Sequence, residues 1–183
     1  MIIDDDKTIV QMLGKPDMQS MGFRWLMQKY GQRLYWHIRR IVISHVEAEK
    51  AFQKTCMKIY SEISSLSVND ELLTYIYRIA TNEALRLLRK QTKCFSSVDS
   101  LRDELKNVLI TESEMQPDRP EMLLQQALLQ HPTWQRIAFS MRYFDNLTYE
   151  QIAIVLGKNV AMVETNYHKV EGIVKAYITK NVQ

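Results

Sequence analysis

From Pro132 to Tyr177 the chain reads PTWQRIAFSMRYF-DNL-TYEQIAIVL-GKN-VAMVETNYHKVEGIVKAY. Apolar residues recur at intervals of three or four in three blocks of this stretch, which predicts helices over 132–144, 148–156 and 160–177. Thr148 followed by Gln151 has the pattern of a capping box, which favours a helix start at that point. Gly157 can take the positive φ that ends a helix tightly. The stretch therefore predicts three helices joined by two short turns.

The second and third of these helices match a helix-turn-helix unit, whose second helix can enter the major groove of DNA. In that helix a core stripe is expected at Val160, Val163, Tyr167, Val170, Val174 and Tyr177. The opposite face carries Ala161, Glu164, Thr165, His168 and Lys169. The same pattern also fits three packed helices without a DNA role, so patterns elsewhere in the chain are needed to distinguish these two interpretations.

Composition excludes several classes of protein. The 183 residues include only five Gly and four Pro, and helical periodicity dominates, so we expect an all-α protein. No run of 18 apolar residues predicts a membrane span, and the N-terminus lacks the features of a secretion signal. Cys56 and Cys94 form no motif, and no Cys/His cluster has zinc spacing. Without a phosphate loop or nucleophile motif, we expect a cytoplasmic protein that is not an enzyme and needs no metal or cofactor.

The charge distribution divides the chain into three parts. The net charge of +3 combines about +5 over residues 1–95, about −3 over 96–120 and about +1 over 121–183. The acidic middle part contains Pro117 and Pro120, which suggests a linker. We therefore expect two small helical domains, 1–95 and 121–183, joined by the acidic linker 96–120.

The first domain carries a second pattern. Periodicity predicts helices over 23–45, 46–63 and 71–93, with a polar loop at Ser61–Asn69 and Asp70 as a helix cap. The last helix presents aromatic, amide and basic side chains: Tyr75, Tyr77, Arg78, Asn82, Arg86, Arg89 and Lys90. Cations neutralise phosphates, aromatic rings stack on exposed bases and Asn can read a base edge, so the face suits separated DNA strands. Core tyrosines and dipole-stabilising cations at a helix end are the alternative interpretation.

Taken in order, these motifs resemble a bacterial RNA polymerase sigma factor of the extracytoplasmic-function (ECF) group. Residues 75–82, YIYRIATN, are similar to the family's W-L-y-r-I-A-r-N, with Tyr75 at the Trp position. Residues 48–53, AEKAFQ, look like the polymerase-binding A-E-D-L-x-Q. Pro132 and Arg136 match P-x-x-x-R, and residues 147–153, LTYEQIA, look like L-s-y-e-E-I-A. The resemblance covers about residues 20–95 and 121–177.

The resemblance implies three sets of contacts. Core polymerase would bind Glu47, Glu49, Lys50 and Gln53. The minus-ten promoter element would contact Tyr75, Arg78, Asn82, Arg86, Arg89 and Lys90, and the loop 61–69 could hold a flipped base. The minus-thirty-five element would contact Arg136, Arg142, Thr148, Lys158, Asn159, Ala161, Glu164, Thr165, His168 and Lys169. An anti-sigma protein is a further partner that the residues leave open.

Several positions depart from the family pattern. Lys50 and Arg86 each replace an Asp, and Glu164 takes a usual Lys position in a helix that the family makes basic. Weak duplex binding is therefore expected from the isolated second domain. Two alternatives to a working sigma factor stay open: a dimeric helix-turn-helix regulator, and a degenerate sigma paralogue that acts as a protein-interaction module.

Overall fold

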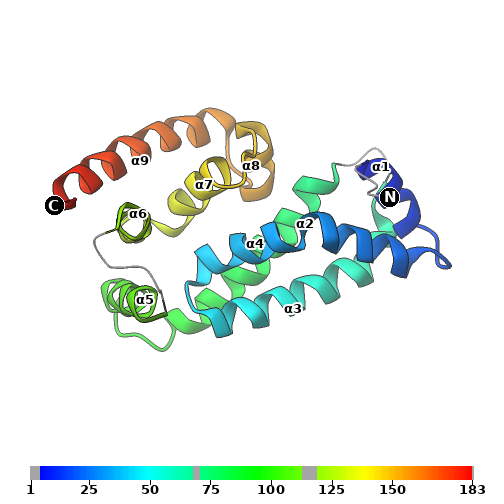
Figure 1. The fold of residues 1–183 in the computed structure, drawn as a ribbon, viewed down its shortest axis with the longest axis horizontal. Helices are drawn as coiled ribbons and strands as arrows, with labels where there is room; N and C mark the ends of the chain where they lie inside the picture. The colour runs from blue at the N-terminus through cyan, green and yellow to red at the C-terminus, as the bar shows by residue number, and fades with distance from the viewer. Residues whose placement is uncertain (1–4, 68–70, 113–118, 183) are drawn as a thin grey trace.

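The computed structural model describes residues 5–67, 71–112 and 119–182, and within these ranges the chain forms nine α-helices and one 3-10 turn (Figure 1). The N-terminal helices are α1 (Asp6–Leu13), α2 (Gln19–Val42), α3 (His45–Glu62) and α4 (Leu72–Thr92), with the 3-10 turn Ile63–Ser65 between α3 and α4. They are followed by α5 (Val98–Glu112), α6 (Pro120–Leu129), α7 (Thr133–Tyr143), α8 (Tyr149–Leu156) and α9 (Val160–Asn181). The expected all-α class is confirmed.

Helices α1–α4 form the first domain, in which α2, α3 and α4 pack against one another (Figure 1). Their inward faces bury aliphatic side chains completely, including Leu34, Ile38, Ile59 and Ile76. The three helices predicted from periodicity are present, with ends that shift by a few residues. The predicted cap Asp70 lies outside the described residues, and Glu71 precedes the first residue of α4.

Helices α6–α9 form the second domain, and its helix-turn-helix follows the prediction closely. The Thr148 side chain accepts a hydrogen bond from the backbone N–H of Gln151, and the Gln151 side chain accepts one from the backbone N–H of Thr148. Gly157 ends α8 in the left-handed conformation with φ of 61°. One expected core position is wrong: Val160 is 37% exposed because it begins α9.

The acidic segment 96–120 is not a featureless linker, because it contains helix α5. Leu101 and Leu105, one turn apart, are buried against the rest of the molecule. At the C-terminal end, Glu112 accepts hydrogen bonds from Arg39 and from the backbone N–H of His45, at 3.0 and 2.7 Å. His45 is the first residue of α3, so the carboxylate stabilises the positive end of that helix. The linker is thereby fastened to the first domain.

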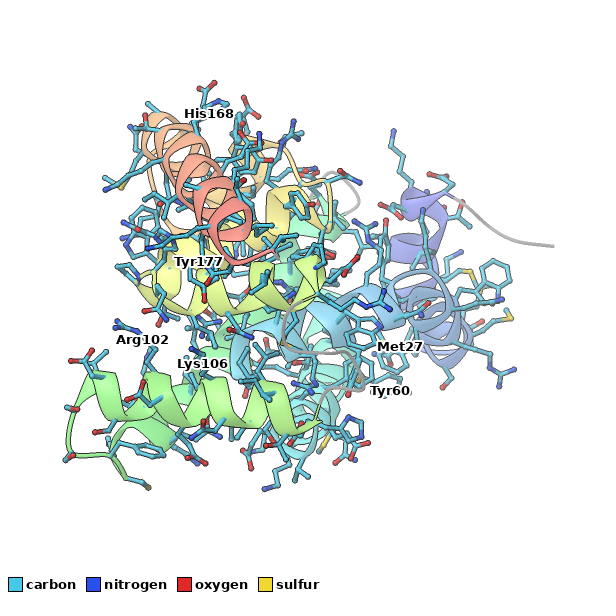
Figure 2. All side chains as sticks on the ribbon, turned by 60° about the vertical axis from the view of Figure 1, so that its left-hand side comes forward. Met27, Tyr60, Arg102, Lys106, His168 and Tyr177 are labelled. Atoms are coloured by element: carbon cyan, nitrogen blue, oxygen red, sulfur yellow. The ribbon has the colours of Figure 1, made fainter. Side chains whose placement is uncertain are left out.

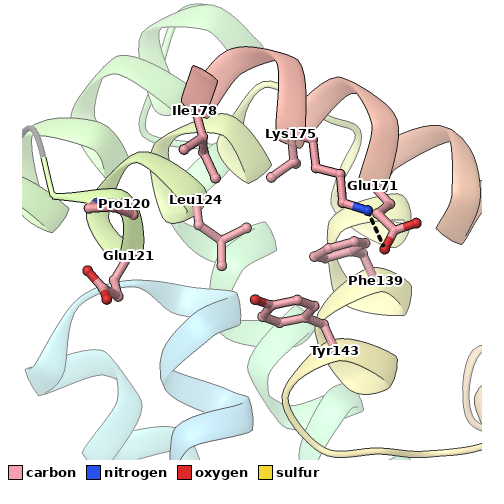
Figure 3. Close-up of a pocket in the computed structure, with 9 residues that line it drawn as sticks. Pro120, Glu121, Leu124, Phe139, Tyr143, Glu171, Lys175 and Ile178 are labelled. Atoms are coloured by element: carbon pink, nitrogen blue, oxygen red, sulfur yellow. Dashed lines mark ion pairs between the residues drawn. The ribbon is translucent and has the colours of Figure 1, made fainter. Parts of the chain in front are cut away.

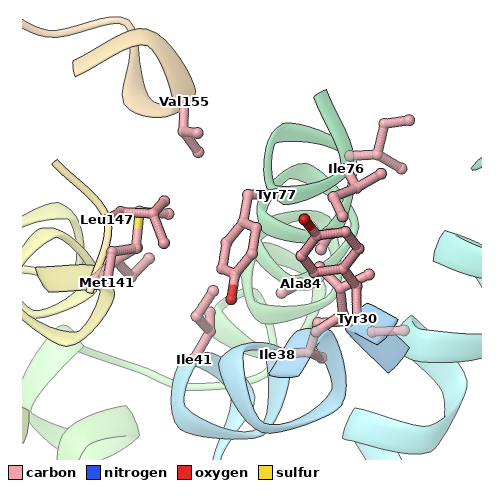
Figure 4. Close-up of a cluster of buried hydrophobic side chains, with 14 of the residues drawn as sticks. Tyr30, Ile38, Ile41, Ile76, Tyr77, Ala84, Met141, Leu147 and Val155 are labelled. Carbon is pink, nitrogen blue, oxygen red and sulfur yellow. The ribbon is translucent and has the colours of Figure 1, made fainter. Parts of the chain in front are cut away.

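The two domains share one hydrophobic core. Apolar residues of α2 and α4 meet those of α7, α8 and the turn between them, and Tyr77 lies among Ile41, Met141, Leu147 and Val155 (Figure 4). The side chain of Tyr77 is fully buried. Its expected place on a DNA-facing surface is therefore wrong, because the docked second domain covers that side of α4.

Candidate nucleic-acid and protein interfaces

Helix α4 has an exposed polar stripe beside its buried face. Of the six residues expected to contact the minus-ten element, Tyr75 is half-buried. The other five are exposed: Arg78, Asn82, Arg86, Arg89 and Lys90. Their spacing of mostly three or four residues puts them on one side of the helix. Burial raises the pKa of the Tyr75 phenol, so it stays neutral. The stripe joins one aromatic ring, one amide and four cations.

A surface pocket of about 310 Å³ lies at the N-terminal end of this stripe. It is lined by Ser65, Leu66, Glu71, Thr74, Tyr75 and Arg78. The predicted loop 61–69 contributes Ser65 and Leu66, while residues 68–70 lie outside the described part of the chain. Glu71 at the pocket also accepts a hydrogen bond from Gln151 of α8. The second domain therefore contacts one of the residues that line this pocket.

The outer surface of the helix-turn-helix presents most of the residues expected there. The exposed ones are Thr148, Lys158, Asn159, Ala161, Glu164, Thr165, His168 and Lys169. Figure 2 shows His168 at the outer edge of α9, away from the first domain. Asn159 caps α9 by accepting from the backbone N–H of Ala161 at 2.8 Å, and the Lys158 ammonium lies 5.1 Å from the centre of the Trp134 ring. Among these residues, two are cations, Lys158 and Lys169, and one is an acid, Glu164.

Arg136 and Arg142 are placed differently from expectation. Arg136 is 5% exposed and donates hydrogen bonds of 2.8 Å to the backbone carbonyls of Arg40 and Ile41 in α2. These carbonyls belong to the last turn of α2, where they have no partner within the helix. Burial lowers the pKa of Arg136 to about 10. In this arrangement Arg136 caps a helix of the first domain and is closed off from phosphates.

Arg142 is committed to its own domain. Its guanidinium donates to the carbonyl of Leu147 at 3.1 Å and stacks over the Tyr149 ring, with a distance of 5.0 Å to the ring centre. The side chain is half-buried, so part of it remains accessible. Arg142 thus holds the turn that begins the helix-turn-helix, whatever else it contacts.

A polar cluster centred on Asp145 joins the domains. The Arg33 guanidinium donates to the Asp145 carbonyl at 2.7 Å, and Arg40 Nη1 lies 3.5 Å from the carboxylate. Burial raises the pKa of Asp145, and the nearby Arg40 opposes that rise. His37 Nδ1 lies 3.8 Å from the carboxylate, but complete burial lowers the pKa of His37 to about 3 and keeps the ring neutral. The sequence interpretation missed Asp145, because an Asp after a helix reads as an ordinary turn residue.

The residues expected to bind polymerase lie on α3. Glu49, Lys50 and Gln53 are exposed, and Glu47 is half-buried. Lys50 pairs with Glu47 at 2.8 Å, and His45 lies 3.2 Å from Glu49. Ala48 and Ala51 on the other side of the helix are buried, which fixes its orientation. One acid of this surface, Glu47, is therefore paired with a neighbouring cation, Lys50.

A groove of about 210 Å³ opens between α6, α7 and α9 (Figure 3). Its walls are largely apolar and include Leu124, Phe139 and Ile178, while Glu171 and Lys175 form an ion pair of 3.2 Å at its edge.

Among the described residues, no group of His, Cys, Asp and Glu could hold a metal ion, and no helix is long and apolar enough to span a membrane.

Comparisons with known proteins agree with this arrangement. Residues 26–94 match the family Sigma-70 region 2, and residues 121–170 match Sigma-70, region 4. The chain is 27% identical to RNA polymerase sigma-H factor of Pseudomonas aeruginosa, with 94% of each chain covered. It is 24% identical to the ECF RNA polymerase sigma factor SigW of Bacillus subtilis, covering 89% of this chain and 91% of the relative.

Solved structures that share the fold include two complexes. CnrH in complex with the cytosolic domain of CnrY has a TM-score of 0.71 at 17% identity, covering 96% of this chain and 98% of that one. The sigma factor RpoE of Bartonella quintana, in complex with the anti-sigma factor NepR, has a TM-score of 0.69 at 17% identity. That likeness covers 86% of this chain and 96% of the solved one.

Proposed function

The chain belongs to the sigma-70 family of RNA polymerase sigma factors, in its ECF group, and from this premise we propose that three of its surfaces divide the work of initiation. The outer side of α3 binds core polymerase, the stripe on α4 binds the separated minus-ten strand, and α9 reads the minus-thirty-five duplex. Sigma factors are not enzymes, and the polymerase performs the chemistry. We place the chain in the cytoplasm, where polymerase and DNA are found.

The observation that carries this proposal is the stripe on α4 and the pocket at its end. A base that leaves the DNA stack costs a few kcal/mol, so a strand-separating surface needs a pocket and a stacking partner. Tyr75 borders the pocket of about 310 Å³, and Arg78 and Asn82 follow along the helix. The four cations of the stripe suit the phosphates of the same strand.

A double substitution tests this assignment. We expect Tyr75→Ala, Asn82→Ala to reduce promoter opening strongly in reconstituted holoenzyme, because the stacking ring and the base-reading amide are both lost. Permanganate footprinting on promoter DNA measures the opening. The matched control is Tyr143→Ala, Gln130→Ala, which removes an exposed tyrosine and an exposed amide from the second domain. Unchanged opening in the α4 variant would refute the assignment.

The polymerase surface has its own test. The resemblance implies Asp at position 50, so Lys50→Asp should keep or strengthen the complex with core polymerase. Pull-down of core polymerase by wild type and by Lys50→Asp measures this binding. If neither wild type nor Lys50→Asp binds core polymerase, a degenerate paralogue is favoured. Binding to a symmetric operator as a dimer, without polymerase, would favour a dimeric regulator.

We also propose an anti-sigma protein as a regulatory partner. Two of the similar solved structures are complexes, one with the cytosolic domain of CnrY and the other with the anti-sigma factor NepR. Such a partner should co-purify with this chain and compete with core polymerase for it. Simultaneous binding of both would argue against an inhibitory role.

A further inference from the structure

We propose that Lys54 of α3, with Arg86 and Lys90 of α4, forms a binding site for one backbone phosphate of the separated DNA strand. The site is a small hollow between the two helices, which lie side by side in Figure 1. It is lined by Ala51, Lys54, Glu83, Arg86, Leu87 and Lys90. This inference rests on the proposed function and adds α3 to the surfaces that contact DNA.

The hollow has the size and chemistry of an oxygen site. Its volume of about 10 Å³ admits one water-sized group, far less than a base requires. None of its lining residues is aromatic, so it offers no stacking surface. Buried Ala51, with its small side chain, lets three long basic side chains reach the same space from two helices. Ammonium and guanidinium groups around an oxygen-sized space favour a phosphate oxygen.

Glu83 organises the cations around the hollow. Its side chain is 5% exposed, and its carboxylate lies 3.5 Å from Lys58 and 3.9 Å from Arg86. One buried acid thus faces two cations, whereas Lys54 and Lys90 have no acidic partner within ion-pair distance among the described residues. The cluster keeps an excess of positive charge, and Glu83 acts as a positioning residue for Arg86.

The hollow lies on the path of a strand held by the base pocket. Arg78 lines the pocket and Arg86 lines the hollow, and these residues are eight positions apart, which is about 12 Å along α4. Asn82 lies between them on the same stripe. Arg86 replaces the Asp implied by the family resemblance, so this chain has a cation where an acid would repel the strand.

The test combines Lys54→Gln with neutral linkages in the DNA. Reconstituted holoenzyme would be titrated with a single-stranded minus-ten oligonucleotide in which one phosphate at a time is replaced by methylphosphonate. At one linkage, or at two adjacent ones, we expect the methylphosphonate to weaken binding by wild type but to cause no further loss of affinity in Lys54→Gln. The slope of log K against log salt should fall by about 0.7 in Lys54→Gln, as for one lost phosphate contact to a single strand. Arg86→Asp should lower the affinity further than Lys54→Gln.

The control is Lys15→Gln, an exposed lysine outside the proposed surfaces, which should leave slope and linkage profile unchanged. Equal sensitivity of wild type and Lys54→Gln at every linkage would overturn the site. Weaker binding of Lys54→Gln to core polymerase without DNA would also overturn it and assign the hollow to an acidic group of polymerase. Failure of wild-type holoenzyme to bind the unmodified strand would instead refute the proposed function itself.

Discussion

Replacing Arg136 by Ala should open the contact between the two domains. The guanidinium donates two hydrogen bonds, each of 2.8 Å, to carbonyls at the end of α2. Hydrogen bonds from a charged donor contribute about 1.5–3 kcal/mol each, or roughly 3–6 kcal/mol for the pair. Burial that lowers the Arg136 pKa from 12.5 to about 10 costs about 3 kcal/mol. The surplus is about 0–3 kcal/mol, so the ratio of open to closed molecules should rise by up to roughly 150-fold.

Energy transfer between dyes on the two domains measures this change. Lys15→Cys in the first domain and Ala176→Cys in the second provide exposed attachment points, in a background where Cys56 and Cys94 are replaced. Transfer should fall in the Arg136→Ala variant, and the radius of gyration from small-angle scattering should rise.

The matched control is Arg142→Ala, because Arg142 lies on the same helix and donates to Leu147 of its own domain. That variant should destabilise the second domain without separating it from the first. Equal transfer efficiency in wild type and Arg136→Ala, with both proteins folded, would show that the cap on α2 does not hold the domains together.

Three further predictions concern the core, acid stability and DNA reading. His37 lies between Arg40 and Asp145, and its pKa is lowered from 6.5 to about 3. Its contribution to the free energy of unfolding is therefore complete above pH 6.5 and decreases on acidification. About 2 kcal/mol of this free energy should be lost by pH 5. The raised pKa of Asp145 has the opposite effect on stability, which it lowers as the pH rises above 3.8. The free energy of unfolding in urea should therefore be compared between wild type and His37→Gln over about pH 5–6.5. The same slope of this free energy against pH in both proteins would contradict the prediction. Phe139→Ala removes a 1% exposed ring stacked on Tyr167 and should cost about 3–5 kcal/mol, measured by denaturation; a loss below 1 kcal/mol would mean that the ring is dispensable. Glu164→Lys should raise duplex affinity of the holoenzyme and change base preference at one position, and an affinity that stays constant would show that Glu164 faces away from DNA.

Local patterns predicted the helix-turn-helix because its signals lie within a few residues of one another. Thr148, Gln151 and Gly157 each act through their own turn of helix, so their roles follow from spacing alone. The stripe of exposed residues on α4 was also predicted, since a helix that packs on one side must expose the other. Contact of that stripe with DNA stays a prediction.

Long-range contacts were not predictable in the same way. Tyr75 and Tyr77 are alike in sequence, but only docking of the second domain buries Tyr77 completely. Arg136 fits a phosphate contact in its motif, and its partners in α2 lie 95 and 96 residues away in the chain. Helix α5 was missed because its acidic composition outweighed the two leucines one turn apart.

Helix α5 also sets how far the second domain can travel. Its fifteen residues span about 22 Å as a helix and about 50 Å when extended. Only Leu101 and Leu105 are buried, and a helix of this length is marginal without such contacts. Once Glu112 releases α3, unwinding of α5 would more than double the span of this segment of the tether between the two DNA-reading surfaces. The local concentration of α9 at upstream DNA is then governed by how readily this one helix melts.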